Sequence, residues 1–409
     1  MRTILIILLI MCVQPKVMAQ QNESFADHIK SLRVMKNGEW DLTPVITFDK
    51  NEYVEISFDD LKHEYVRYNY VVRHCNADWT FSDILESEYM DGFNTNIIED
   101  YTQSMATKVE YNRYSLSIPN ENVKLLIAGN YCVQIFEEDE ESPIAQCFFS
   151  IVEPRIIISA EINGNTDIDT YDSHQQINLT INHQHYNIRN PHNDIKVIVC
   201  QNRRWDNYVT NIKPTYIQNN RLIYTHNKNL IFNAGNEYRR FEIVDEYVPG
   251  MNVDKIEYHE PYYHATLYTD EQRINYLYDK DQDGKYFVRN SKDIDNETES
   301  EYIYTHFKLE MPQLAGGNVF INGDLSNNVF TKNNQMIYNS MNHAYEISLL
   351  LKQGSYNYQY LFVPNGEKQG YTQHIEGDFH QTENNYSIYV YHRGFGDRHD
   401  RLIGFVEIR

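Results

Sequence analysis

A short acidic run in the second half of the chain has the residue types of a cation site. Asp279, Asp281 and Asp283 alternate before Gly284, as the carboxylates and the turn glycine do at the start of a calcium-binding loop. Such a loop also needs a bidentate glutamate at its twelfth position, where this chain has Asn290. The flanking residues alternate like strands. The pattern therefore favours an acidic hairpin turn over a calcium site.

Two histidines at a spacing of two could hold a metal on one face of a strand. His183 and His185 have this spacing, and side chains two residues apart on a strand share a face. No carboxylate or third histidine accompanies them at a diagnostic spacing. Surface histidines in a Tyr- and Asn-rich strand are the favoured interpretation, so the sequence predicts no metal site and no cofactor.

Motifs of catalysis are missing from the sequence. No Gly-x-Ser-x-Gly, activated cysteine or Ser-x-x-Lys pattern lies in a strand-turn-helix context, and there is no glycine-rich phosphate loop. Neighbouring acids are common in a chain with 58 acidic and 36 basic residues, and the acids between Glu137 and Glu141 favour a solvated turn over an acid-base pair. We therefore expect no catalytic residues and no enzyme. No sequence motif supports the alternative of an unrecognised hydrolase.

The net charge limits the classes of partner. A formal charge of −22 argues against nucleic acid and against an anionic membrane, because neutralising phosphates needs clustered Lys and Arg. A basic or neutral protein surface, or a neutral glycan, is compatible with this charge.

The N-terminus has the organisation of an export signal. Arg2 precedes an apolar run from Ile4 to Val13, and Val17-Met18-Ala19 forms a small-residue cleavage site before Gln20. The run is too short to span a bilayer as a helix, and Cys12 follows Met11 without the small residue of a lipid-attachment site. We expect a cleaved signal peptide (1–19) and a soluble exported protein.

Four cysteines follow the expected signal, Cys75, Cys132, Cys147 and Cys200, and export permits disulfides. Cys132 and Cys147 flank a predicted hairpin turn and would lie opposite one another in a symmetric register, so they are the one pair to name. Two small buried hydrophobic side chains are nevertheless the favoured interpretation, because an isolated cross-strand bridge in a large domain is uncommon.

Alternating apolar residues and turn signals predict an all-β chain with three consecutive immunoglobulin-like or E-set-like sandwiches. The expected domains are 20–153, 154–312 with longer loops, and 313–409. One helical turn is predicted over Asp83 to Glu88, capped by Ser82. Trp79 and Trp205 each stand beside polar residues at a strand end, and we expect them to cover open ends of the core rather than contact a ligand.

The third predicted domain resembles the immunoglobulin-like glycan-binding modules of starch- and glycogen-processing enzymes. Gln353 to Tyr360 matches their Pro-Gly-x-Tyr-x-Tyr strand, but the preceding turn has Asn328 where those modules place a sugar-stacking Trp. The resemblance implies a glycan-binding protein as the alternative function. Tyr356, Tyr358 and Tyr360 share one face of a strand, and we expect that face to pack against a sheet or neighbouring domain.

A second resemblance covers nearly the whole mature chain, through motifs that occur in one order. They are Tyr68-Asn69-Tyr70 with His74-Cys75-Asn76-Ala77-Asp78-Trp79, Gly92-Phe93, Tyr111-Asn112-Arg113-Tyr114, Ala128-Gly129-Asn130-Tyr131, Gln201-Asn202-Arg203-Arg204-Trp205-Asp206-Asn207, Ala234-Gly235-Asn236-Glu237-Tyr238-Arg239, Leu351-Lys352-Gln353-Gly354-Ser355-Tyr356-Asn357-Tyr358, Glu376-Gly377-Asp378-Phe379 and Thr382-Glu383-Asn384. Together they resemble the plug protein family of the Bacteroidota type IX secretion system. The resemblance implies a periplasmic, non-enzymatic protein that binds the outer-membrane translocon barrel and closes its periplasmic mouth.

A loop near the C-terminus has the composition of an interface anchor. Between Tyr391 and Arg398 it combines arginines and aromatic residues with turn glycines. We therefore take Arg393, Phe395 and Arg398 as candidate partner-binding residues. Pairing of the two arginines with nearby acids in a structural hairpin is an equally good interpretation.

Overall fold

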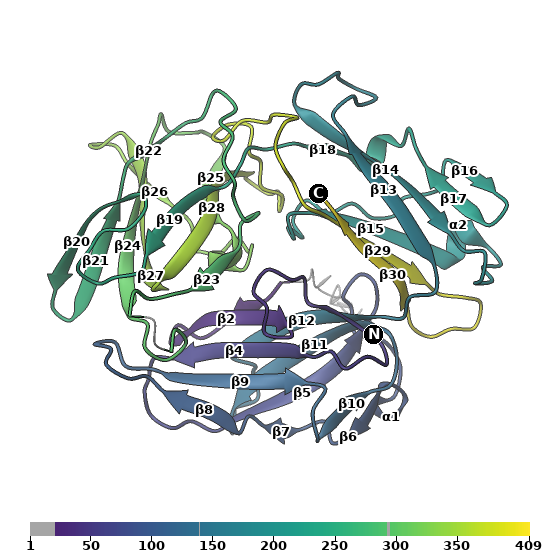
Figure 1. Ribbon diagram of the computed structural model, residues 1–409, viewed down its shortest axis with the longest axis horizontal. Coiled ribbons are helices and arrows are strands. Elements are labelled where there is room, and N and C mark those ends of the chain that lie inside the picture. Colours follow the sequence, from purple (N-terminus) through teal and green to yellow (C-terminus); the bar gives the residue numbers. More distant parts are fainter. Residues whose placement is uncertain (1–20, 139, 293–294) are drawn as a thin grey trace, which may run out of the picture.

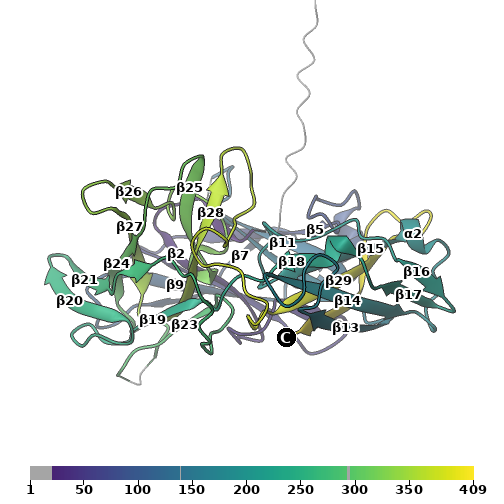
Figure 2. The same cartoon turned by 90° about the horizontal axis from the view of Figure 1, so that it is seen from above.

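The computed structural model describes residues 21–138, 140–292 and 295–409. The chain is almost entirely β, which confirms the predicted class. Three lobes form a triangle when the molecule is viewed down its shortest axis (Figure 1), and Figure 2 shows how flat the body is. No described helix is long and apolar enough to cross a membrane. The expected signal peptide and Cys12 lie outside the described residues.

Lobe 1 (residues 21–153) is a sandwich at the bottom of Figure 1. Its first sheet has the order β1-β12-β11-β5-β7 with β3 beside β12, and its second has the order β2-β4-β9-β8, while β6 and β10 form a small ribbon. Apolar residues of the two large sheets meet in one core. The bounds are β1 Glu23–Ser24, β2 Ile29–Lys36, β3 Val45–Thr47, β4 Val54–Asp60, β5 Tyr68–Cys75, β6 Met90–Gly92, β7 Asn96–Ile97, β8 Asp100–Gln103, β9 Asn112–Ile118, β10 Val123–Leu125, β11 Gly129–Glu137 and β12 Ala145–Val152.

Lobe 2 (residues 154–235 and 380–409) packs a sheet of order β13-β14-β17-β16, with β18 beside β14, against the three-stranded sheet β15-β29-β30. Its core lies between these sheets. The bounds are β13 Ile157–Asn163, β14 His174–Asn182, β15 Ile195–Gln201, β16 Tyr216–Gln218, β17 Arg221–Tyr224, β18 Ile231–Asn233, β29 Tyr386–His392 and β30 Arg401–Ile408.

Lobe 3 (residues 236–379) pairs the long strand β28 with β19, β23 and β25, and faces them with a sheet of order β20-β21-β24-β27-β26, with β22 beside β24. Ten of the eleven residues of β28 are buried, so this strand is the centre of the lobe's core. The bounds are β19 Arg239–Ile243, β20 Val253–His259, β21 Tyr262–Leu267, β22 Asp270–Glu271, β23 Tyr286–Val288, β24 Tyr302–Glu310, β25 Gly317–Asn322, β26 Ile337–Asn339, β27 Ala344–Lys352 and β28 Gly354–Pro364.

Strand pairing crosses the border that the sequence predicts between residues 312 and 313. β15 pairs along its whole length with β29, and β29 pairs with β30. β19, from the predicted middle domain, pairs with β28. Lobe 3 is therefore inserted into lobe 2, because the two strands that complete lobe 2 come from the end of the chain.

The short helices differ from the prediction in place. α1 spans Glu86–Tyr89, and the other helical segments are α2 Pro191–Asp194, η1 Lys228–Leu230 and η2 Asp324–Ser326. The turn predicted over 83–88 thus begins three residues later. Ser82 does not cap it, because the Ser82 hydroxyl donates to the His74 carbonyl oxygen and lies 2.8 Å from His74 Nδ1.

The predicted opposition of Cys132 and Cys147 is wrong by one residue. Cys132 faces Phe148, and Cys147 faces Val133. A shift of one residue turns the two cysteine side chains to opposite faces of the sheet, so they cannot be bridged. All four described cysteines are free and buried, which confirms the favoured interpretation of small buried hydrophobic side chains.

Candidate functional site: the junctions between the lobes

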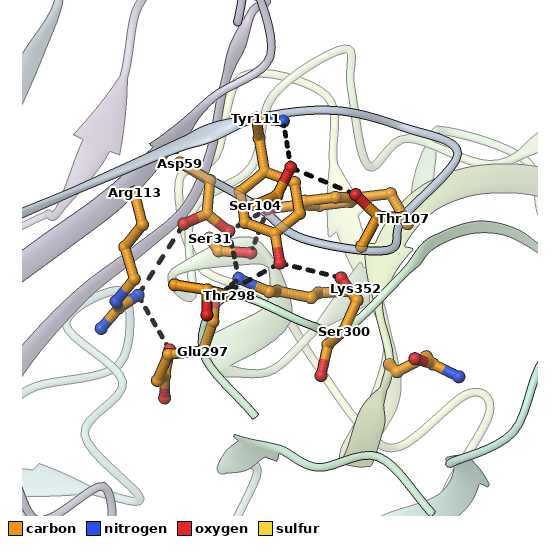
Figure 3. A network of polar contacts seen from close by, with 12 residues as sticks. Ser31, Asp59, Ser104, Thr107, Tyr111, Arg113, Glu297, Thr298, Ser300 and Lys352 are labelled. Atoms are coloured by element: carbon orange, nitrogen blue, oxygen red, sulfur yellow. Dashed lines mark hydrogen bonds and ion pairs between the residues drawn. The ribbon is translucent and has the colours of Figure 1, made fainter. Parts of the chain in front are cut away.

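A fully buried lysine joins lobe 3 to lobe 1. Lys352 ends β27, and its Nζ donates to Asp59 Oδ2 at 2.6 Å and to the Glu297 carbonyl oxygen at 2.6 Å (Figure 3). The Tyr302 hydroxyl donates to the same Asp59 oxygen at 2.7 Å. Burial lowers the pKa of Lys352 to about 8, although Asp59 and Glu297 act in the opposite direction. The lysine holds the edge of one sandwich against the other.

Two arginines of lobe 1 bind one glutamate of lobe 3. Arg113 Nη1 lies 2.8 Å from Glu297 Oε2, and Arg33 donates to the same oxygen. Burial alone would raise the pKa of Glu297, but the positive charges of Arg33, Arg113 and Lys352 hold it below its usual value. Removing one member of such a buried set typically costs about 3–5 kcal/mol, because an uncompensated charge stays behind.

The segment that carries Glu297 continues along lobe 1 as a strap. The Met105 amide donates to the Thr298 carbonyl oxygen at 3.0 Å, and the Val109 amide donates to Glu301 Oε1 at 3.0 Å. The Tyr111 hydroxyl donates to the Ser300 carbonyl oxygen at 2.9 Å. We call this contact, together with Lys352 and the arginines, the latch; its hydrogen bonds and ion pairs are joined by an edge-to-face contact of the Tyr111 and Tyr302 rings at 5.3 Å.

The junction of lobes 1 and 2 is apolar by contrast. Trp79 and Trp205 meet edge to face, with ring centroids 5.4 Å apart. Both belong to a buried cluster drawn from the two lobes, Val45, Cys75, Ala77, Trp79, Cys132, Phe148, Val152, Ile198, Cys200, Trp205, Tyr389, Tyr391 and Leu402. Each tryptophan therefore covers the end of its own lobe's core, and it also packs against the tryptophan of the other lobe.

Buried Asp400 fixes the register of this apolar junction. Its Oδ2 accepts from the Ala77 amide at 2.9 Å and from Lys196 Nζ at 2.8 Å. Nearby, the Tyr391 hydroxyl donates to Asn130 Oδ1 at 2.9 Å. Other polar contacts lie at the edge of the apolar cluster: the Thr43 hydroxyl donates to Glu407 Oε1 at 2.5 Å and accepts from Arg203 Nε at 2.9 Å.

Lobes 2 and 3 share a third, polar junction. Buried Arg204 pairs with Asp206 at 2.6 Å and donates to the Gly370 carbonyl oxygen at 2.7 Å, while the Gly370 amide donates to Asp206. The Glu383 amide of lobe 2 donates to Glu237 Oε1 of lobe 3 at 3.1 Å. Burial would lower the pKa of Arg204, but Asp206 raises it, so the pair is ionic.

Most of the motifs that carry the family resemblance lie at these three junctions. Residues 74–79, 111–114, 128–131, 201–207, 234–239, 351–358, 376–379 and 382–384 lie at or beside these junctions. Sequence reasoning found these stretches but missed Asp59 and Glu297. Neither residue belongs to one of the motifs given above. The partner of a carboxylate on one lobe can be identified only when the other lobe is in place.

The candidate partner-binding residues behave in three different ways. Arg393 Nη2 donates to the Arg398 carbonyl oxygen at 2.9 Å and so closes the hairpin between β29 and β30. Arg398 pairs with Glu88 of lobe 1. Phe395, at the tip, is fully exposed. The two arginines hold the loop in place, and Phe395 is the one of the three candidates with a fully exposed side chain.

The acidic run and the histidine pair have structural contacts. Asp281 accepts from the amides of Tyr238 and Asp283, and burial with nearby acids raises its pKa to about 7. His183 is buried beyond the end of β14, and its Nδ1 lies 3.1 Å from the Tyr186 carbonyl oxygen, so it does not share a strand face with His185. Among the described residues, no group of three or more His, Cys, Asp or Glu side chains is placed to hold a metal.

The tyrosine face of β28 is closed to sugar. Tyr356, Tyr358 and Tyr360 are all at most 3% exposed, and Tyr356 stacks on Phe241 at 5.1 Å inside the core of lobe 3. A stacking platform needs a free ring face. The packing of these rings follows the prediction and removes the feature on which the glycan alternative rested.

Comparison with known proteins gives one family and one close structure. Residues 29–153 match the family model described as the type 9 secretion system plug protein 1st domain. No curated protein sequence is significantly similar to the chain. The crystal structure of a hypothetical protein from Parabacteroides merdae has 46% sequence identity and a TM-score of 0.94, over 96% of this chain and 100% of that one. Its lobes are thus arranged in the same way.

Two further solved structures show no common fold. They are the C-terminal domains of antigen I/II-family proteins from Streptococcus agalactiae and Streptococcus pyogenes. Each alignment covers 92% of this chain and 98% of the other, with 6% and 7% identity and a TM-score of 0.15.

Proposed function

Since the chain belongs to the type 9 secretion system plug protein family, we propose that it is a non-enzymatic plug that binds the outer-membrane translocon barrel of that system. It closes the periplasmic opening of the barrel and keeps the outer membrane sealed. It works in the periplasm and reaches the outer membrane through its partner, without entering the membrane itself.

The shape of the body supports this proposal most directly. The three lobes form a flat triangle (Figures 1 and 2), each in contact with the other two through buried side chains. A stopper must be broad and must keep its shape when it covers an opening. In the closed arrangement, interlobe contacts that bury Trp79, Lys352 and Arg204 hold the three lobes together more firmly than flexible linkers would.

We propose that Phe395 is one anchor of the docking surface. It is fully exposed at the tip of a hairpin that Arg393 closes and Arg398 ties to lobe 1. A rigidly presented aromatic ring loses little freedom on binding. A specific complex needs on the order of 1,600 Å² of buried surface in total, so this hairpin forms only part of the interface.

The proposal is tested by purifying the tagged protein from native cell envelope and identifying what comes with it. We expect a very large outer-membrane barrel in near-stoichiometric amount. Recovery of the folded protein without such a barrel would refute the plug function.

The anchor is tested separately with two variants in the same purification. Phe395→Ala should reduce barrel recovery, whereas Met341→Ala, which removes a side chain 87% exposed on lobe 3, should not. If both variants recover the barrel as the unchanged protein does, the docking surface lies elsewhere while the plug function stands.

A further inference from the structure

The polypeptide passes between lobe 2 and lobe 3 at one place only, and lobe 3 meets the other lobes elsewhere through side-chain and backbone contacts. The chain enters lobe 3 through residues 234–238 and leaves it through 376–384, and these two crossings lie side by side. The Gly235 amide donates to Asp378 Oδ1 at 3.0 Å, and the Phe379 amide donates to the Gly235 carbonyl oxygen at 2.8 Å. Two adjacent crossings form a natural hinge, because few backbone torsions must change for the inserted lobe to turn.

Lobes 1 and 2 have no comparable freedom. The chain crosses once between them, and this crossing is bonded to β30: the amides of Glu153 and Arg155 donate to the carbonyl oxygens of Leu402 and Ile403, each at 2.9 Å. Beside it lies the apolar cluster with Trp79 and Trp205. Separating these lobes would expose that cluster to water.

The contact of lobe 3 with lobe 1 is hollow as well as polar. A cleft of about 730 Å³ lies between them, with Ala26, Ile29 and Lys30 on one wall and Leu349, Leu350 and Leu351 on the other. A second hollow of about 220 Å³ lies at the hinge, lined among others by Asn202, Gly235 and Thr372. A hollow of about 250 Å³ between lobes 1 and 2 is lined by Val152 and Phe405 among others. The cleft between lobes 1 and 3 is larger, so that contact lacks more packing interactions.

The latch also contains polar atoms whose bonding is incomplete. Arg33 Nε and Asp59 Oδ1 are buried and have no hydrogen-bond partner among the described residues. Buried charges lose their hydration when the latch closes, and unpaired polar atoms in it regain partners only from water. Opening the latch therefore returns hydration to several charged groups at once. The contact of lobes 1 and 2 also holds unpartnered polar atoms, Trp79 Nε1 and Asp400 Oδ1, but opening it would also expose the apolar cluster to water.

We propose that lobe 3 swings as one body about the crossings at 234–238 and 376–384, with the Lys352, Asp59 and Glu297 contacts as its latch. Lobes 1 and 2 keep their arrangement relative to each other, and lobe 3 moves relative to both. This motion is a property of the chain itself and does not depend on the proposed function.

The first test is hydrogen exchange on the unaltered protein. The amides of Met105, Lys108 and Val109 bond across the latch, and those of Ala77 and Glu153 bond across the contact of lobes 1 and 2. We expect the three latch amides to exchange at least 10-fold faster than the other two, relative to their unprotected rates. Equal or greater protection of the latch amides would overturn the proposal.

The second test uses pairs of spin labels and their distance distributions. Labels on cysteines introduced at Tyr101, Tyr216 and Met341, which are exposed on lobes 1, 2 and 3, give one distance for each pair of lobes. The four described native cysteines are buried and free, so they do not take up label. Lys352→Met removes the ion-pair partner of buried Asp59, which keeps only the Tyr302 hydroxyl on Oδ2. This change should raise the ratio of open to closed molecules by about 100-fold or more.

Two controls make the second test decisive. Lys352→Met with Asp59→Asn removes both charges and should return most molecules to the closed distance. Lys196→Met breaks the ion pair with Asp400 at the apolar junction and should leave all three distances unchanged. The proposal fails if Lys352→Met alters the distance between lobes 1 and 2, or if it leaves the distance between lobes 1 and 3 unaltered.

Discussion

The contact between Trp79 and Trp205 should be measurable as a coupling between two lobes. Both side chains are at least 92% buried, and truncating a buried tryptophan to alanine costs about 3–5 kcal/mol of unfolding free energy. Their edge-to-face contact at 5.4 Å contributes about 0.5–1.5 kcal/mol beyond the area that it buries. The double variant should therefore be less destabilised than the sum of the single variants by about 1 kcal/mol.

The assay is urea unfolding followed by far-ultraviolet circular dichroism, which does not depend on the removed fluorophores. Trp79→Ala, Trp205→Ala and the double variant form the cycle. Trp79→Ala combined with Phe241→Ala is the control, because Phe241 lies in the separate core of lobe 3 and distant sites add within about 0.3–0.5 kcal/mol. A Trp79–Trp205 cycle that is additive within that margin would refute the interlobe role of these residues.

Three further predictions concern lobe 1. Burial, with His399, lowers the pKa of His74 to about 3. The neutral histidine therefore contributes its full stabilisation above pH 6.5, and this contribution is lost as the pH falls from there towards 3. At pH 5 the unfolding free energy should be about 2 kcal/mol lower because of this group, a loss that His74→Gln should not show. Gly129→Ala should lower the free energy of unfolding by at least about 2 kcal/mol, because φ at Gly129 is +147° and an added Cβ would lie 2.3 Å from His74 Nε2. Gly316→Ala is the control and should lower it less, because an added Cβ there meets nothing within 4 Å. Equal decreases of the urea midpoint for the two variants would contradict this prediction. Burial raises the pKa of the Cys132 thiol to about 12, so an aromatic disulfide reagent should find all four described thiols unreactive until urea unfolds the chain; rapid reaction of native protein would count against the buried assignment.

Local patterns predicted the strands well because each face of a strand records its own burial. The alternation of apolar and polar residues predicts strands over 53–58, 65–74 and 111–118, and β4, β5 and β9 begin and end within three residues of those bounds. β20 was missed: its residues after Val253 are half-buried or exposed, and an exposed strand leaves no alternation of apolar residues. Short edge strands such as β8, with all four residues exposed, were missed for the same reason.

The order of the lobes could not be predicted from local patterns. The pairing of β15 with β29 joins residues such as Val197 and Val390, and neither strand carries a mark of its partner. Proline and glycine punctuation at 312–317 marks only the turn between β24 and β25. The same limit applies to the latch, because Lys352 and Asp59 meet only after both sandwiches have formed.

The sheet of order β15-β29-β30 also decides when the protein can finish folding. Lobe 2 needs strands from opposite ends of a long stretch of sequence, so its contact order is high and its closure is slow. A chain that emerges N-terminus first can complete lobe 1 early, while β15 waits with an unpaired edge until residues 386–408 arrive. During that interval the open edge is a site for aggregation or for a chaperone.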